Sequence, residues 1–95
     1  MPEINFKIQW PDGTEQNCYS PSLVVKKYFN PGEIYELTEF VSKSRTALNI
    51  ASDRVKKAYG FPCSRALGQL KQIESKASEY QKLSQPKVLF INFID

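Results

Sequence analysis

Residues 3–10 alternate strictly between polar and apolar side chains. The apolar positions are Ile4, Phe6, Ile8 and Trp10, and the polar positions are Glu3, Asn5, Lys7 and Gln9. Because successive side chains of a strand point to opposite faces, this pattern predicts a strand with one buried face and one solvated face. The Pro-Asp-Gly sequence at 11–13 predicts a chain reversal, and residues 14–19 then form a polar return strand.

The segment after this hairpin changes to helical spacing. Ser20 followed by Pro21 is typical of a helix cap and a first helical residue, which predicts a short helix over residues 21–29. The Asn-Pro-Gly sequence at 30–32 ends that helix. Residues 33–37 are extended or irregular, and the pattern leaves that choice open.

Two longer helices follow, each with an apolar stripe at three- and four-residue spacing. Thr38 caps the first and Gly60 ends it, and the second covers about residues 64–82. The stripe of the first helix comprises Phe40, Val41, Ser44, Ala47, Leu48, Ala51, Val55, Ala58 and Tyr59, and that of the second comprises Ala66, Leu67, Leu70, Ile73, Ala77 and Tyr80.

Residues 87–93 predict a last strand that is apolar on both sides. The economical arrangement of these elements is an α+β fold of two layers, forming a single domain over residues 1–95. A small sheet of three strands, in the order 2-1-3, is covered on one face by an antiparallel helix pair and the short helix. Counting chain reversals through the helices makes the last strand parallel to the first.

The last strand also suggests an interface. Strict alternation points one set of its side chains away from the helices, namely Leu89, Ile91 and Phe93. Either residues 33–37 fold over that face or a second chain covers it, and the pattern favours a homodimer. Gly68 lies on the polar side of the last helix, where either the close approach of a partner chain or neutral drift explains a glycine.

The amino-acid composition indicates the class of protein and its cellular compartment. The 95 residues are 41% apolar and have a net charge of +3, which indicates a folded domain with a weak preference for acidic partners. Two cysteines make no disulfide framework, and the N-terminus has no signal-peptide pattern, so we expect a cytoplasmic protein with reduced thiols. The apolar run at 88–91 is too short to span a bilayer, so no membrane contact is expected.

The chain has no histidine, which removes the commonest general base and metal ligand. Phosphate-binding loops and the serine-hydrolase elbow are also absent from the sequence. The sequence therefore disfavours an enzyme, and we expect neither a metal nor a cofactor. The small charge excess and the mixed charges of the last helix disfavour nucleic-acid binding.

Cys63, Ser64 and Arg65 stand together where the last helix begins. A helix N-terminus and a nearby cation lower the pKa of a thiol, so Cys63 is a candidate nucleophile; alternatively it is a small apolar residue at the corner, with Ser64 as the helix cap. Free backbone N–H groups, Ser64 and Arg65 are also candidate ligands for a phosphate or carboxylate.

A polar stripe follows one face of the preceding helix. Its members are Arg45, Asn49, Ser52 and Lys56, at positions i, i+4, i+7 and i+11. This stripe is a candidate contact surface, and the alternative is an ordinary solvated helix face.

Longer segments resemble a known family. They are residues 10–13, 18–37 and 44–74, the last including the sequence YGFPCSRALGQL at 59–70. These blocks are similar to the small bacterial nitrogen starvation response proteins. The resemblance implies genes clustered with a nitrilase, a role in drawing nitrogen from nitriles or cyanide, and a partner encoded in that cluster; it assigns no site residues.

The function that fits these observations best is that of a non-catalytic cytoplasmic accessory or interaction protein. The runner-up is a domain that binds an anion or small molecule at Ser64 and Arg65. A thiol-dependent enzyme or carrier acting through Cys63 comes third.

Overall fold

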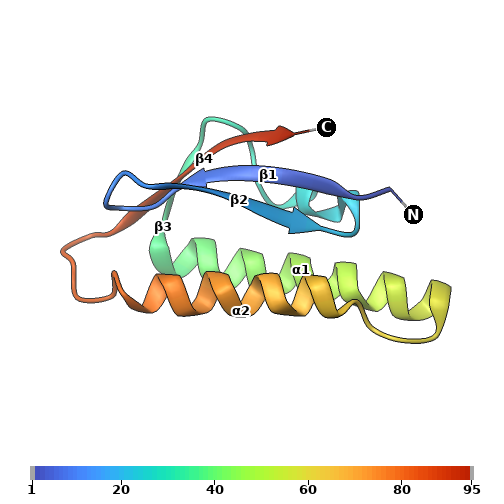
Figure 1. Cartoon of the computed structure of the whole chain (residues 1–95). Helices are drawn as coiled ribbons and strands as arrows, with labels where there is room; N and C mark the ends of the chain where they lie inside the picture. The colour runs from blue at the N-terminus through green and yellow to red at the C-terminus, as the bar shows by residue number, and fades with distance from the viewer. Residues whose placement is uncertain (1, 95) are drawn as a thin grey trace.

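The computed structural model describes residues 2–94. Two layers make up the molecule, an antiparallel sheet and a helical hairpin that covers one of its faces (Figure 1). In chain order the elements are β1 (Ile4–Gln9), β2 (Glu15–Ser20), the 3₁₀ helix η1 (Leu23–Lys27), β3 (Ile34–Glu36), α1 (Leu37–Tyr59), α2 (Ser64–Ser78) and β4 (Lys87–Ile94).

The sheet has four strands in the order β2-β1-β4-β3, so the prediction of three strands is wrong. The predicted neighbours of the first strand are confirmed, because β1 pairs with both β2 and the C-terminal β4. The additional strand is β3, which comes from residues 33–37, the segment that the pattern left undecided. It pairs with β4 at the sheet edge, with Ile34 opposite Leu89.

All strand pairs are antiparallel, which corrects the predicted parallel pairing of β4 with β1. A count of reversals over β1, β2, α1, α2 and β4 alone gives the parallel direction. In the structure η1 stays near the end of β2, but β3 then returns the chain along the sheet before α1 begins. This additional crossing adds one reversal, so β4 runs antiparallel to β1.

A β-bulge in β4 changes which side chains face the core. The register with β1 shifts between Lys7, which pairs with Asn92, and Ile8, which pairs with Phe90. The bulge reverses the alternation beyond it, so Phe93 lies opposite the buried Phe6 and packs against the core. The predicted outward position of Phe93 is therefore wrong.

Stacked aromatic rings form the centre of the core. The rings of Phe29 and Phe90 lie 5.0 Å apart and those of Phe6 and Phe90 lie 5.5 Å apart, measured between centroids. Phe40 joins them from α1, 5.4 Å from Phe29. The alternating residues of β1 are buried as predicted, and Val88 and Phe90 of β4 are buried on the same face.

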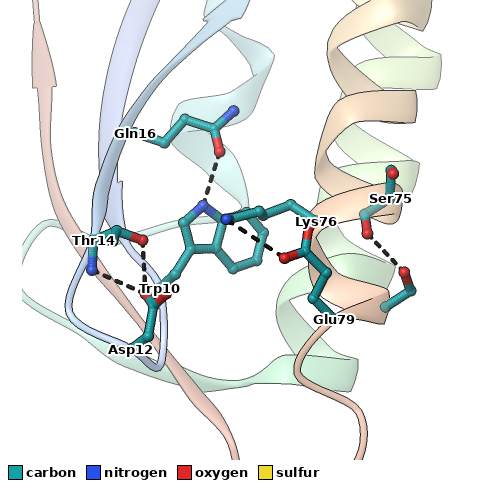
Figure 2. A network of polar contacts seen from close by, with 8 residues as sticks. Trp10, Asp12, Thr14, Gln16, Ser75, Lys76 and Glu79 are labelled. Atoms are coloured by element: carbon teal, nitrogen blue, oxygen red, sulfur yellow. Dashed lines mark hydrogen bonds and ion pairs between the residues drawn. The ribbon is translucent and has the colours of Figure 1, made fainter.

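Trp10 packs the β1–β2 hairpin against the end of α2 (Figure 2). Its ring stacks on Tyr80 at 5.7 Å, and its indole N–H donates a 2.8 Å hydrogen bond to Oε1 of Gln16. Asp12 closes the turn by accepting hydrogen bonds from the hydroxyl and the backbone N–H of Thr14. These two bonds lower the pKa of Asp12 to about 2.

The helix ends differ from the predictions in detail. α1 begins at Leu37, whose N–H donates to the carbonyl of Pro86, so Thr38 is not its cap. Gly60 is the C-cap as predicted, because its φ of 90° is a left-handed conformation that favours glycine. α2 ends at Ser78, four residues before the predicted boundary.

The first short helix also starts later than predicted. Its N-cap is Ser22, whose hydroxyl accepts a hydrogen bond from the backbone N–H of Val24. Ser20 instead ends β2, and its hydroxyl donates to the carbonyl of Ser22. Pro21 lies in the turn between them.

Candidate interaction site at the tip of the helical hairpin

The helices are longer than the sheet that they cover. α1 has 23 residues and extends about 34 Å, whereas the six residues of β1 extend about 20 Å. The end of the hairpin therefore projects beyond the strands (Figure 1). We refer to residues 53–65 as the hairpin tip. Of the residues predicted to lie in the buried stripe, Val55 is only half-buried, and Ala58 and Tyr59 are exposed.

Two aromatic side chains stand exposed at the hairpin tip. Phe61 is 66% exposed, more than any other large hydrophobic side chain within residues 2–94, and Tyr59 is 59% exposed. Gly60 between them makes the left-handed turn that ends α1. Aromatic side chains of this kind are enriched at protein interfaces, because they bury a large apolar area at a low cost in conformational entropy.

The net charge of the chain is concentrated in the same segment. The hairpin tip contains four basic residues and one acidic residue, and the rest of the sequence contains nine of each. The tip thus accounts for the whole net charge of +3. A count of charges along segments of the sequence identifies this surface as a whole, whereas the motifs selected Cys63, Ser64 and Arg65 at its C-terminal end and, separately, Lys56 as part of a polar stripe.

The two arginines of the tip are held by neighbouring elements. Nη1 of Arg54 donates a 3.1 Å hydrogen bond to the hydroxyl of Ser22. The guanidinium of Arg65 stacks on the ring of Tyr19, 3.9 Å from the ring centroid. Lys56 and Lys57 are exposed in the last turn of α1, next to the aromatic residues at the end of the helix.

Tyr19 of β2 contacts α2 near its start and holds the helix against the sheet. Its backbone N–H donates to Oε1 of Gln69 in α2, and its hydroxyl donates to Oε2 of Glu3 at 2.9 Å. Burial, followed by that hydrogen bond, raises the pKa of Tyr19 to about 12. The edge strand β2 is therefore covered by α2, and the direction of Arg65 is set by the sheet.

The residues predicted at the start of α2 do lie together, with altered roles. Cys63, rather than Ser64, occupies the N-cap position, and its side chain makes no capping hydrogen bond. Its backbone N–H donates to the hydroxyl of Ser52, which is buried and therefore not part of an exposed stripe. Ser64 is the first helical residue and is exposed.

The other members of the predicted stripe lie at three positions along α1. Lys56 belongs to the hairpin tip, and Asn49 is exposed in the middle of the helix. Arg45 lies nearer the start of the helix, where Nε and Nη2 both donate to Oε2 of Glu74 at 3.0 and 2.8 Å. This exposed ion pair joins α1 to α2 and contributes little to stability.

The predicted interface residues on the sheet remain half-exposed. Leu89 and Ile91 are half-buried on the face turned away from the helices, where Ile34 and Ile94 are also exposed. β3 joins the sheet edge and does not fold over that face. Gly68 is exposed, and a Cβ atom built on it would meet no atom within 4 Å, so no close packing inside the domain requires glycine there.

The two thiols should differ sharply in reactivity. Burial raises the pKa of Cys18 to about 12, and its side chain is 1% exposed, whereas Cys63 is half-buried at the tip. We expect iodoacetamide at pH 8 to modify Cys63 of the native protein and to reach Cys18 only after unfolding. Peptide mass mapping checks this, and equal labelling of both cysteines in the native protein would contradict it.

Residues 2–94 contain neither a membrane-spanning helix nor a cluster of metal ligands. Neither helix has an apolar stretch long enough to cross a membrane. No group of three or more cysteine and acidic side chains lies close enough to hold a metal ion. Within this part of the chain, the hairpin tip is the surface where exposed aromatic residues and unbalanced charge coincide.

Comparison with known proteins identifies the family. Residues 5–93 match the family model described as nitrogen starvation-induced protein NitG. The chain belongs to the NitG family. This confirms the predicted resemblance to nitrogen starvation response proteins, and the match includes the whole hairpin tip. No curated protein and no solved structure matches the chain.

Proposed function

We propose that this NitG-family protein is a non-catalytic interaction protein of the nitrogen starvation response, and that it binds an acidic protein surface through the hairpin tip. The observation that supports this most is the coincidence of the most exposed aromatic side chain, Phe61, with the entire net positive charge. Phe61 and Tyr59 enter an apolar depression on the partner, and Lys56 and Lys57 pair with carboxylates at its rim.

A protein partner fits this surface better than an anionic membrane does. Arg54 and Arg65 are engaged with Ser22 and Tyr19, which leaves the two lysines as the cations that extend from the helix end. Each basic residue near an anionic lipid surface contributes about 1 kcal/mol. Two lysines are therefore too few for stable membrane attachment, whereas a protein pocket adds shape complementarity around the aromatic rings.

We further place this role in a pathway that draws nitrogen from nitriles or cyanide, with a cytoplasmic partner encoded near a nitrilase. The support for this finer assignment is the sequence resemblance described above. If it is right, loss of the protein should impair growth when a nitrile is the sole nitrogen source more than when ammonium is limiting.

The experiment that tests the function is rescue of growth under nitrogen starvation. A deletion strain is supplied with the wild type, Phe61→Ser, or the control Leu83→Ser, which removes a side chain that is 50% exposed outside the hairpin tip. We expect Phe61→Ser to fail and Leu83→Ser to succeed, with both proteins folded. Equal rescue by the two variants would contradict the proposal, and binding of the purified protein to anionic vesicles that requires Phe61 would indicate a membrane instead.

The alternative function is binding of a small anion at the start of α2, and Arg65 provides a test of it. If a small anion binds at the start of α2, millimolar phosphate should raise the Tm of the wild type, because a ligand of the native state stabilises it by mass action. Arg65→Ala should reduce that shift. We expect equal small shifts of Tm in both proteins, and a shift that depends on Arg65 would favour the alternative.

A further inference from the structure

The short helix η1 lies beside the part of α1 that leads into the hairpin tip (Figure 1). The two elements are joined by Arg54, whose Nη1 donates a 3.1 Å hydrogen bond to the hydroxyl of Ser22. Ser22 is buried and is the N-cap of η1, since its hydroxyl also accepts from the backbone N–H of Val24. The start of η1 is therefore fixed next to the hairpin tip.

η1 presents one apolar side chain to solvent. Val24 and Val25 are buried, whereas Leu23, the first residue of the helix, is 40% exposed. One exposed leucine is ordinary on a protein surface, but this one lies next to the segment that bears the exposed Tyr59 and Phe61. Exposed apolar side chains that gather in one region mark binding surfaces.

Basic side chains occupy the surface between η1 and the aromatic residues of the tip. Arg54 and Lys57 are three residues apart in α1, so they share the face that is turned toward η1. η1 itself contains Lys26 and Lys27 and no acidic residue. Asp53 is the acidic residue of the tip, and it lies about 100° around the helix from Arg54 because the two are consecutive. The surface that joins the two elements therefore attracts carboxylates.

We infer that the partner of the hairpin tip also contacts η1, and that Leu23 and Phe61 are the two apolar contacts. The partner surface that fits has two apolar depressions with carboxylates between them, because Arg54 and Lys57 lie between the two side chains. The hydrogen bond from Arg54 to Ser22 sets the spacing of the two contacts before binding, which lowers the entropy lost on association. This inference rests on the proposed function, since it adds η1 to the same site and specifies the chemistry of the same partner.

Photocrosslinking from both elements tests this arrangement. A photoreactive phenylalanine analogue is placed at position 23, 61 or 83 of the full chain in cells starved of nitrogen. Positions 23 and 61 should give an adduct with the same protein, and position 83, an exposed leucine outside both elements, should give none. Lys27→Glu should lower the yield from position 61 by roughly 10-fold, because repulsion replaces an attraction to a carboxylate. Lys71→Glu, which reverses an exposed lysine of α2 outside the tip, should leave that yield unchanged.

Growth of the deletion strain under nitrogen starvation is the second measurement. Leu23→Ser should fail to restore growth, whereas Leu83→Ser should succeed, with both proteins folded by circular dichroism. An adduct from position 61 and none from position 23, or full growth with Leu23→Ser, overturns the inference and leaves the proposed function standing. The proposed function fails in a different way, because Phe61→Ser then restores growth as well as Leu83→Ser does and neither position gives an adduct.

The identity of the adducts decides between one partner and other occupants. Adducts of positions 23 and 61 with two different proteins, or with lipid in place of protein, overturn the inference of a single acidic protein that spans both elements. If Leu23→Ser fails to fold, the comparison of positions 23 and 61 and the effect of Lys27→Glu decide the question.

Discussion

Phe90→Ala should lower the free energy of unfolding by about 3–5 kcal/mol. Phe90 is fully buried, and its ring lies within 5.5 Å of the rings of Phe6, Phe29 and Phe93, measured between centroids. It belongs to β4, which pairs with β1 on one side and β3 on the other, so few neighbours can move to fill the cavity. Total stabilities are typically about 5–15 kcal/mol, which makes this a large fraction.

Urea denaturation followed by circular dichroism measures this loss. The matched control is Phe61→Ala, the same substitution at the exposed hairpin tip, which should change the free energy of unfolding by no more than about 0.5 kcal/mol. Similar losses for the two variants would contradict the assignment of Phe90 to the core and of Phe61 to the surface.

The double variant Lys56→Glu/Lys57→Glu should weaken binding to an acidic partner by roughly 100-fold or more, because opposed like charges cost several kcal/mol. Growth of the deletion strain under nitrogen starvation should then not be restored. The last turn of a helix favours basic residues, so the reversal also costs about 1 kcal/mol of stability. Circular dichroism at the growth temperature must therefore show a folded protein.

A variant with the same change in net charge controls for this experiment. Lys71→Glu/Lys82→Glu reverses two exposed lysines outside the hairpin tip. It should restore growth like the wild type. If both double variants fail equally, the net charge of the protein matters rather than the tip, and the proposed site is wrong.

Local sequence patterns predicted those parts of the fold that interactions between residues close in sequence determine. The alternation of β1 specified its buried face, and Gly60 specified the end of α1, since its left-handed φ is costly for other residues. The order of β2, β1 and β4 also followed from the sequence. The buried face of β1 and the end of α1 depend on residues that are close in sequence or on a single hydrophobic period.

The missed features depend on pairing between distant segments. β3 is only three residues long and becomes a strand because β4 lies beside it. The bulge in β4 arises from its register with β1, and no pattern within 87–93 indicates that Phe93 turns inward. The antiparallel direction of β4 follows from the extra crossing that β3 makes, so the strand that was missed also explains the wrong direction.

The candidate site was predicted only in part, because the exposure of its residues also depends on distant parts of the fold. The motif search selected Cys63, Ser64 and Arg65, which the structure brings together, but it placed Ser52 on the surface and Tyr59 in the core. Helical periodicity gives the side of a helix that is apolar, whereas exposure of Tyr59 and Phe61 depends on where the covering sheet ends. Only the relative lengths of α1 and the strands determine that.

The most direct test of the account is site-specific crosslinking in living cells. A photoreactive phenylalanine analogue is placed at position 61, or at position 83 as the control, and cells are irradiated during nitrogen starvation and in rich medium. We predict a specific protein adduct from position 61 in starved cells, lost when Lys56→Glu/Lys57→Glu is added, and none from position 83. Equal adducts from both positions, or none from position 61 in starved cells that need the protein for growth, would contradict the claim that the hairpin tip is the site of interaction.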